Sequence, residues 1–146
     1  MIRPIEKKDK EQFLRMLREF YESDAVMAPV PLENHELTFD AIIEGSPYAE
    51  AYIIEKDGEA AGYAQVSLTW STEAGGLTVW LEEFYVRGQY RGMGLGHEAF
   101  DFIFRRFEGR ARRYRLEVED YNKGAIRLYE KMGFSFMPYL SMHKDI

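Results

Sequence analysis

With 146 residues, 46% of them hydrophobic and 30% charged, the chain has the composition of one globular domain, which we expect to span residues 1–146. Its formal net charge of −6 argues against a protein that binds nucleic acid by neutralising phosphates, and the absence of cysteine excludes disulfides, cysteine-rich zinc sites and a cysteine nucleophile. No apolar stretch is long enough for a signal sequence or a membrane span, so we expect a cytoplasmic protein.

The chain opens with one predicted strand and one predicted helix. "IRPI", residues 2–5, favours a short strand. Residues 9–24 predict a helix because apolar side chains recur at helical spacing, namely Phe13, Leu17, Phe20 and Tyr21. Asp9 and Gln12 stand in the relation of a capping box at its start.

A proline-rich loop, a second helix and a hairpin are expected next. Two prolines in residues 25–34 predict the loop, and residues 35–45 predict a weaker helix that ends at its glycine. "DGE", residues 57–59, is a strong hairpin signal between strands over 48–56 and 60–70.

The rest of the chain mixes strands and helices. After a turn we expect a strand over 77–86, a helix over 95–109, a strand over 113–119 and a helix over 122–133. Short strands are predicted at 134–138 and 139–145. The order indicates an α/β protein, mixed α+β in sequence, whose sheet is mixed because a strand–helix–strand crossover follows three antiparallel strands.

Three glycines in five positions mark "YRGMGLG", residues 90–96, just before the helix over 95–109. Glycine costs conformational entropy, so a backbone that must approach a ligand closely is the favoured explanation. The free N–H groups and the dipole of a helix start both favour a phosphate. No Gly-Lys-Ser/Thr of a P-loop occurs, and the third glycine of a dinucleotide fingerprint falls one place early, at Gly96. A plain turn with a helix cap is the alternative.

Residues 91–96 match a third pattern, R-x-x-G-x-G. Together with "LEEFYV" before them and "NKGAIRLYEKMGF" after them, they make the chain resemble the GNAT N-acetyltransferase superfamily. The resemblance covers nearly the whole chain in element order and is specific over residues 81–134. It implies a central mixed, mostly antiparallel sheet flanked by about four helices. It also implies an enzyme that uses acetyl-CoA as co-substrate and needs no metal.

The resemblance implies which residues hold coenzyme A. Its pyrophosphate is expected on the loop and helix start formed by Arg91, Gly92, Met93, Gly94, Leu95 and Gly96. The pantetheine arm is expected to run like an added strand beside Phe84, Tyr85 and Val86. Asn122, the predicted cap of the last helix, is expected to contact the pantetheine, and Lys131 to add a cofactor contact.

Three side chains are expected to carry the chemistry. By resemblance, Tyr129 lies near the sulfur and protonates or hydrogen-bonds the leaving thiolate, the alternative being a core tyrosine. Without cysteine a ping-pong route is excluded, which leaves direct attack by an amine in a ternary complex. Glu82 and Glu83 are the candidate bases, on opposite strand faces unless a bulge intervenes. We favour Glu82 as base with Glu83 near the substrate amine, the alternative being a solvated strand edge.

The acceptor is expected to be a small cationic amine, because "WLEEFYV" and "YRGMGLG" are similar to diamine and polyamine acetyltransferases. Carboxylates and aromatic faces attract ammonium groups. The residues expected to wall the acceptor are Tyr21, Glu22, Asp24, Glu33, Trp80, Glu82 and Glu83. The alternatives are a protein, peptide or amino-acid amine as acceptor, or a non-catalytic acyl-CoA-binding regulatory module on the same fold. Many relatives are dimers, so a homodimer is possible.

His97 and Asp101 lack the further ligands of a zinc site.

Overall fold

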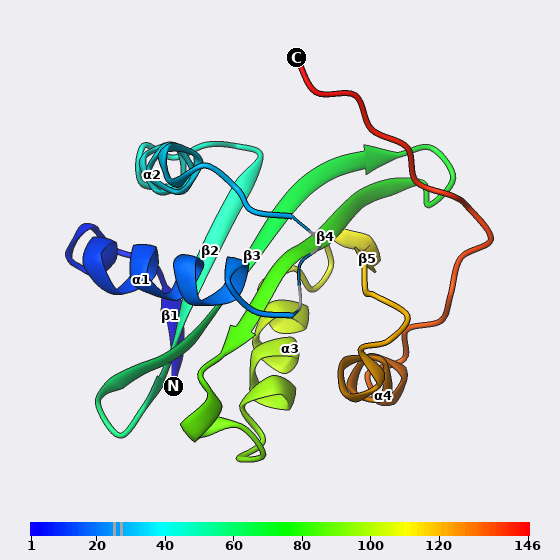
Figure 1. The fold of residues 1–146 in the computed structure, drawn as a ribbon. Helices are drawn as coiled ribbons and strands as arrows, with labels where there is room; N and C mark the ends of the chain where they lie inside the picture. The colour runs from blue at the N-terminus through cyan, green and yellow to red at the C-terminus, as the bar shows by residue number, and fades with distance from the viewer. Residues whose placement is uncertain (25, 27) are drawn as a thin grey trace.

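A five-stranded sheet in the order β1-β2-β3-β4-β5 forms the centre of the molecule (Figure 1). The structure is a computed structural model and describes residues 1–24, 26 and 28–146. Its strands are β1 (Ile2–Pro4), β2 (Ala49–Lys56), β3 (Glu59–Ser71), β4 (Gly76–Val86) and β5 (Ala111–Leu116). Its α-helices are α1 (Lys10–Tyr21), α2 (Leu32–Ile43), α3 (Leu95–Arg106) and α4 (Lys123–Lys131), with 3-10 turns η1 (Lys7–Asp9) and η2 (Gly88–Tyr90). The first four strands are antiparallel and β5 joins β4 in parallel, which confirms the mixed sheet and its flanking helices.

Two hydrophobic layers hold the helices to the sheet. Helices α1 and α2 cover one face and α3 covers the other (Figure 1). Strand alternation divides the side chains between the faces: Ile53 packs with α1, whereas its neighbour Tyr52 packs with α3. Phe13 of α1 is fully buried on one face, and Phe100 of α3 is 2% exposed on the other.

Two turns form where the sequence predicts them. The β2–β3 hairpin turns at Asp57 (φ 52°) and Gly58 (φ 81°), the two left-handed residues of a tight hairpin turn. Helix α2 is followed by Gly45 (φ 87°), and the N–H of Ser46 bonds back to the carbonyl of Ala41 at 3.0 Å. Both boundaries follow from residues that tolerate positive φ.

Two predictions for the N-terminal helices are wrong. Helix α2 begins at Leu32 instead of residue 35, because Pro31 stands at the N-cap and a proline does not hinder the helix that follows it. The expected capping box of Asp9 and Gln12 does not form. The carboxylate of Asp9 instead accepts from Arg3 at 2.7 and 2.8 Å and from the N–H of Glu6 at 2.8 Å.

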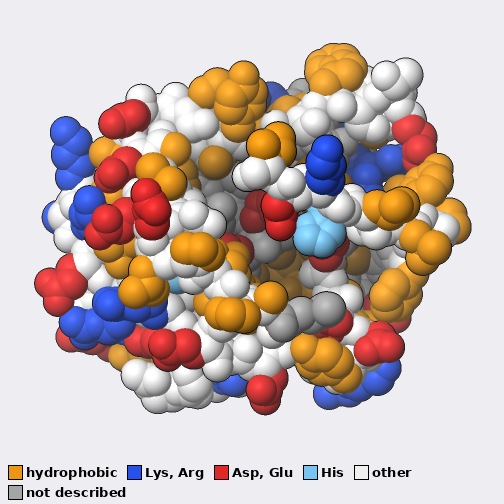
Figure 2. Space-filling model, turned by 45° about the horizontal axis from the view of Figure 1, so that its top comes forward, with side chains coloured by type: hydrophobic (Ala, Val, Ile, Leu, Met, Phe, Trp, Pro, Cys, Tyr) orange, Lys and Arg blue, Asp and Glu red, His pale blue; other side chains and the backbone are white. Residues whose placement is uncertain are grey.

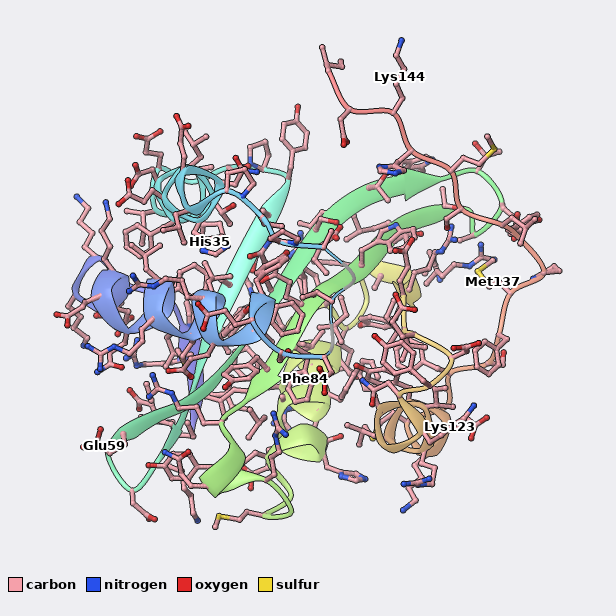
Figure 3. All side chains as sticks on the ribbon, in the orientation of Figure 1. His35, Glu59, Phe84, Lys123, Met137 and Lys144 are labelled. Atoms are coloured by element: carbon pink, nitrogen blue, oxygen red, sulfur yellow. The ribbon has the colours of Figure 1, made fainter. Side chains whose placement is uncertain are left out.

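The C-terminal segment also differs from expectation. Residues 134–146 form no strand, although two were predicted there. Phe134 still packs against the core, but the apolar side chains that follow it are exposed, among them Leu140 at 95% and Met142 at 97%. A strand needs a hydrogen-bonded neighbour, and the segment runs away from the edge of β5, past the labelled Met137 and Lys144 (Figure 3). Strand β5 likewise ends at Leu116, before the predicted residue 119.

Candidate active site

A bulge in the middle of β4 creates the site. Gln65 of β3 faces Glu83, and the next residue, Val66, faces Leu81, so Glu82 is an extra residue without a partner on β3. The extra residue reverses the alternation of side chains. Leu81 and Phe84 therefore both pack towards α3, whereas Glu83 between them faces α1.

The same stretch is where β4 and β5 separate. Their parallel pairing ends at Leu81 and Leu116, so residues 82–86 of β4 have no neighbour on the β5 side. A cleft of about 1320 Å³ opens there, which we call the loop cleft because the glycine loop forms one of its walls. Figure 3 labels Phe84 on β4 and Lys123 at the start of α4, and both residues line this cleft. The cleft exposes an unpaired strand edge to a ligand.

The glycine loop presents backbone donors to this cleft. Gly92 and Gly94 have φ of 75° and 81°, a conformation that side-chain-bearing residues rarely adopt. The first helical bond of α3 runs from Glu98 N–H to Gly94 O, so the amides of residues 95–97 precede it. A Cβ on Gly96 would lie 2.9 Å from Leu128 Cδ2, so this glycine allows close packing of α3 against α4. The result is a helix start with free N–H groups beside Arg91, whose Nε donates to Val86 O at 2.9 Å.

Helix α4 brings two of the predicted residues to the loop cleft. Asn122 is its N-cap, as expected, because its Oδ1 accepts from Ala125 N–H at 3.2 Å. This bond uses the carbonyl oxygen and leaves the side-chain NH₂ as a donor. Tyr129, two turns further, also lines the cleft. The side chains of Met93 and Lys131 are exposed and are not among the lining residues, so the structure does not bring them to this cleft.

A second cleft, of about 880 Å³, meets the first. We call it the tail cleft because residues 134–143 of the C-terminal segment form part of its wall. The two clefts share six lining residues, which are Phe20, Glu82, Glu117, Val118, Glu119 and Tyr129. Figure 2 shows a hollow on this face, with carboxylate side chains inside it and hydrophobic ones around its rim. A ligand in either cleft can therefore contact Glu82 and Tyr129.

Glu82 and Tyr129 have different surroundings. The Glu82 carboxylate is exposed and accepts a hydrogen bond from Ser67 Oγ. The Tyr129 ring packs against Phe100 and Phe134, with centroids 5.7 and 6.1 Å away. Burial raises the pKa of the Tyr129 phenol above its ordinary value, so it stays protonated at neutral pH. The junction of the clefts thus holds one exposed carboxylate and one proton donor.

Glu83 lies behind the tail cleft and lines neither cleft. Its carboxylate accepts hydrogen bonds from the phenols of Tyr21 and Tyr63, the latter at 2.8 Å. Burial raises the pKa of Glu83, while the two phenol donors act in the opposite direction. That Glu83 lies near the substrate amine stays a prediction; its carboxylate is linked to the tail cleft by the phenol of Tyr21, which lines that cleft.

Of the other residues expected around an acceptor, three line one of the clefts and two line neither. Tyr21 lines the tail cleft, and Glu22 and Asp24 line the loop cleft. Glu33 and Trp80 line neither, and the Trp80 ring lies 4.2 Å from the guanidinium carbon of Arg115. Sequence reasoning missed three carboxylates of the tail cleft, those of Glu117, Glu119 and Glu130. For Glu117 and Glu119 the signal was "LEVED", an acidic run at the end of a predicted strand.

Comparison with known proteins identifies the architecture. The model of the acetyltransferase (GNAT) family matches residues 11–134. The chain belongs to the GNAT acetyltransferase family. It is an acetyl-transferring enzyme, which confirms the resemblance drawn from the glycine loop and the last helix.

Relatives of this GNAT enzyme act on several amines. It is 31% identical over 144 residues to the thialysine N-epsilon-acetyltransferase of Mus musculus, covering 90% of this chain and 82% of that one. It is 29% identical over 84 residues to the spermine/spermidine N(1)-acetyltransferase of Bacillus subtilis, covering 55% of each. Its fold matches that of AAC(6')-Iy in complex with a bisubstrate analogue, CoA-S-monomethyl-acetylneamine. That match has a TM-score of 0.81 at 17% identity and covers 100% of this chain and 97% of that one.

Within residues 1–24, 26 and 28–146, no three His, Asp or Glu side chains gather as a metal site would require. No helix in this part of the chain has both the length and the apolar composition to cross a bilayer.

Proposed function

We propose that this GNAT enzyme transfers acetyl from acetyl-CoA to a primary amine of a small cationic molecule, by direct attack in a ternary complex. The observation that carries the proposal is the meeting of two clefts at Glu82 and Tyr129. Such a junction lets a thioester from one side and an amine from the other reach the same pair of groups. Holding both reactants there supplies much of the acceleration.

The loop cleft fits acetyl-CoA. The amides of Leu95 and Gly96 at the start of α3 suit a pyrophosphate, and the open edge of β4 suits the amide-bearing pantetheine arm. The side-chain NH₂ of Asn122 is a further donor for the arm. A main-chain N–H at the bulge would stabilise negative charge on the thioester oxygen. Met93 and Lys131 are left out of this binding scheme because neither lines the cleft.

The proton transfers follow from the two shared residues. An alkylammonium has a pKa of ~10.4 and must lose a proton before its nitrogen can attack the carbonyl carbon. Glu82 takes that proton, directly or through water. When the new C–N bond has formed and the C–S bond breaks, the Tyr129 phenol gives its proton to the departing thiolate. No cysteine is present to carry the acetyl group in between.

The tail cleft supports a cationic acceptor. Four carboxylates line it, those of Glu82, Glu117, Glu119 and Glu130, against one arginine and one histidine. Its tyrosine and phenylalanine rings offer faces to an ammonium group. Relatives named for spermine, spermidine and thialysine are consistent with this class of acceptor.

The test is thiol release from acetyl-CoA with a panel of polyamines, thialysine, aminoglycosides, neutral amino acids and short peptides. We expect the highest kcat/KM for the multiply charged small amines. Their KM should rise with salt, because added salt screens the attraction between an ammonium and the carboxylates. A preference for peptides or for uncharged amines, with salt-independent KM, would contradict the proposed acceptor while leaving the family intact. Acetyl-CoA binding without turnover on any amine would instead support a non-catalytic module.

A further inference from the structure

Tyr21, the last residue of α1, is placed unusually for a tyrosine at the wall of a cleft. It lines the tail cleft, yet its hydroxyl donates a hydrogen bond away from the cleft, to the carboxylate of Glu83. In both hydrogen bonds of this carboxylate the phenol is the donor and a carboxylate oxygen the acceptor. The phenol oxygen therefore has lone pairs left and no proton to offer to a ligand.

Neighbouring side chains hold this arrangement in place. The Tyr63 phenol donates to the other oxygen of Glu83 at 2.8 Å, which fixes the carboxylate. The ring of Tyr21 is packed between aromatic neighbours, with the Phe20 centroid at 5.1 Å and the His35 centroid at 5.2 Å. Figure 3 labels His35 on α2, the helix that packs against α1. The phenol oxygen is thus a pre-oriented hydrogen-bond acceptor.

We propose that Tyr21 binds the amino group of the acceptor through its phenol oxygen, and that Glu83 is the positioning residue that keeps the phenol proton away from the cleft. This inference rests on the proposed function and names a specificity-determining residue for it. Donation to a carboxylate increases the negative charge on the phenol oxygen, which strengthens a hydrogen bond from an N–H group.

Glu82 complements Tyr21 in this arrangement. Both side chains line the tail cleft, and after burial and Glu83 the charge of Glu82 also raises the pKa of the Tyr21 phenol. An amino group bound between them meets a carboxylate oxygen of Glu82, which takes its proton, and the phenol oxygen of Tyr21, which only orients it. The Tyr21 contact is made to the bound amine before reaction, so its loss should appear in KM of the acceptor more than in kcat.

The test compares three variants by steady-state kinetics with the best amine of the panel. Tyr21→Phe should raise KM of the amine about tenfold, the effect of one hydrogen bond to a charged group, with kcat and KM of acetyl-CoA within about twofold. Glu83→Gln should raise KM of the amine at least as much. The NH₂ of the glutamine donates to the phenol of Tyr21, so the Tyr21 hydroxyl proton then points towards the cleft and no longer away from it. Tyr52→Phe is the matched control. Its phenol donates to Glu50, but it packs on the α3 side of the sheet and lines neither cleft.

The outcomes separate the inference from its alternatives. An unchanged KM of the amine in Tyr21→Phe overturns the inference, and so does a fall in kcat alone. A lower melting temperature in Tyr21→Phe and Glu83→Gln without any change in KM assigns both residues a structural role only. If the wild-type enzyme acetylates no amine, the proposed function itself fails, which is a different result from active enzyme with unaffected variants. A tenfold rise in KM for Tyr52→Phe would also overturn the inference, because the effect would not be specific to the cleft.

Discussion

Replacing Tyr129 by phenylalanine separates its chemical role from its packing role. Within the part of the chain that the structure describes, the Tyr129 hydroxyl has no hydrogen-bond partner, and burial alone raises its pKa. Its ring contacts Phe100 and Phe134, contacts that phenylalanine keeps. The substitution therefore removes one proton donor and leaves the packing of α4 intact, so the melting temperature should change little.

The expected effect is a fall in kcat of ~10²-fold, about 2.7 kcal/mol of transition-state stabilisation, which is the lower part of the range for a positioned proton donor. Thiol release at saturating acetyl-CoA and amine measures it, and the affinity for acetyl-CoA should stay nearly constant. Because the raised pKa keeps the phenol protonated, the ratio of wild-type to variant kcat should be constant between about pH 7 and pH 9.

Tyr52→Phe is again the matched control, since Tyr52 belongs to the same hydrophobic cluster and donates to Glu50. It should lose about 1 kcal/mol of stability, the value of one hydrogen bond, while keeping kcat. Tyr129→Phe should show the reverse pattern. Undiminished kcat in Tyr129→Phe would refute the reasoning and leave Tyr129 as a packing residue, its proton replaced by one from water.

Three further substitutions test the fold and the cofactor side. Gly94→Val should abolish the rise in melting temperature given by acetyl-CoA, because φ of 81° is strained for valine by about 1–2 kcal/mol and the loop must shift; an unchanged rise would exclude the loop as the binding site. Gly62→Ala should lower the free energy of unfolding by about 3 kcal/mol in urea, because its Cβ would lie 2.2 Å from Tyr85 O; a loss below about 0.5 kcal/mol would contradict this. In His35→Leu the loss of stability in acid should shrink. Burial and Arg18 lower the pKa of His35, so below the ordinary 6.5 the unfolded chain takes up a proton that the folded one does not, and wild-type stability falls as pH falls. Parallel pH profiles from denaturant titrations of the two proteins would count against this assignment.

Local signals predicted most of the fold. The hairpin at Asp57 and Gly58, the cap at Asn122 and the glycine loop each depend on a few adjacent residues with restricted backbone choices. The resemblance to the GNAT family added the central mixed, mostly antiparallel sheet with about four flanking helices. Both kinds of signal are present in the chain before any long-range contact forms.

Features that depend on distant partners could not be placed from the sequence, even where, as for a bulge near Glu82 and Glu83, the possibility was foreseen. Alternation could not locate the bulge at Glu82, because a bulge is defined by the pairing of β4 with β3. The burial of Glu83 depends on Tyr21 and Tyr63, which lie far from it in sequence. The C-terminal segment alternates like a strand, yet residues 134–146 have no neighbour to pair with. In each case the missing information was tertiary.

The end of the β4–β5 ladder at Leu81 and Leu116 affects how this enzyme can evolve. On the loop-cleft side the separated strands and the helix start offer mainly peptide groups, which a point mutation does not replace. On the tail-cleft side the wall is built from side chains, among them Glu130, Met137 and Tyr139, which do not line the loop cleft. In the proposed function, mutations there change the accepted amine one residue at a time while the acyl donor stays the same. A library restricted to these three codons is therefore the economical route to new acceptors.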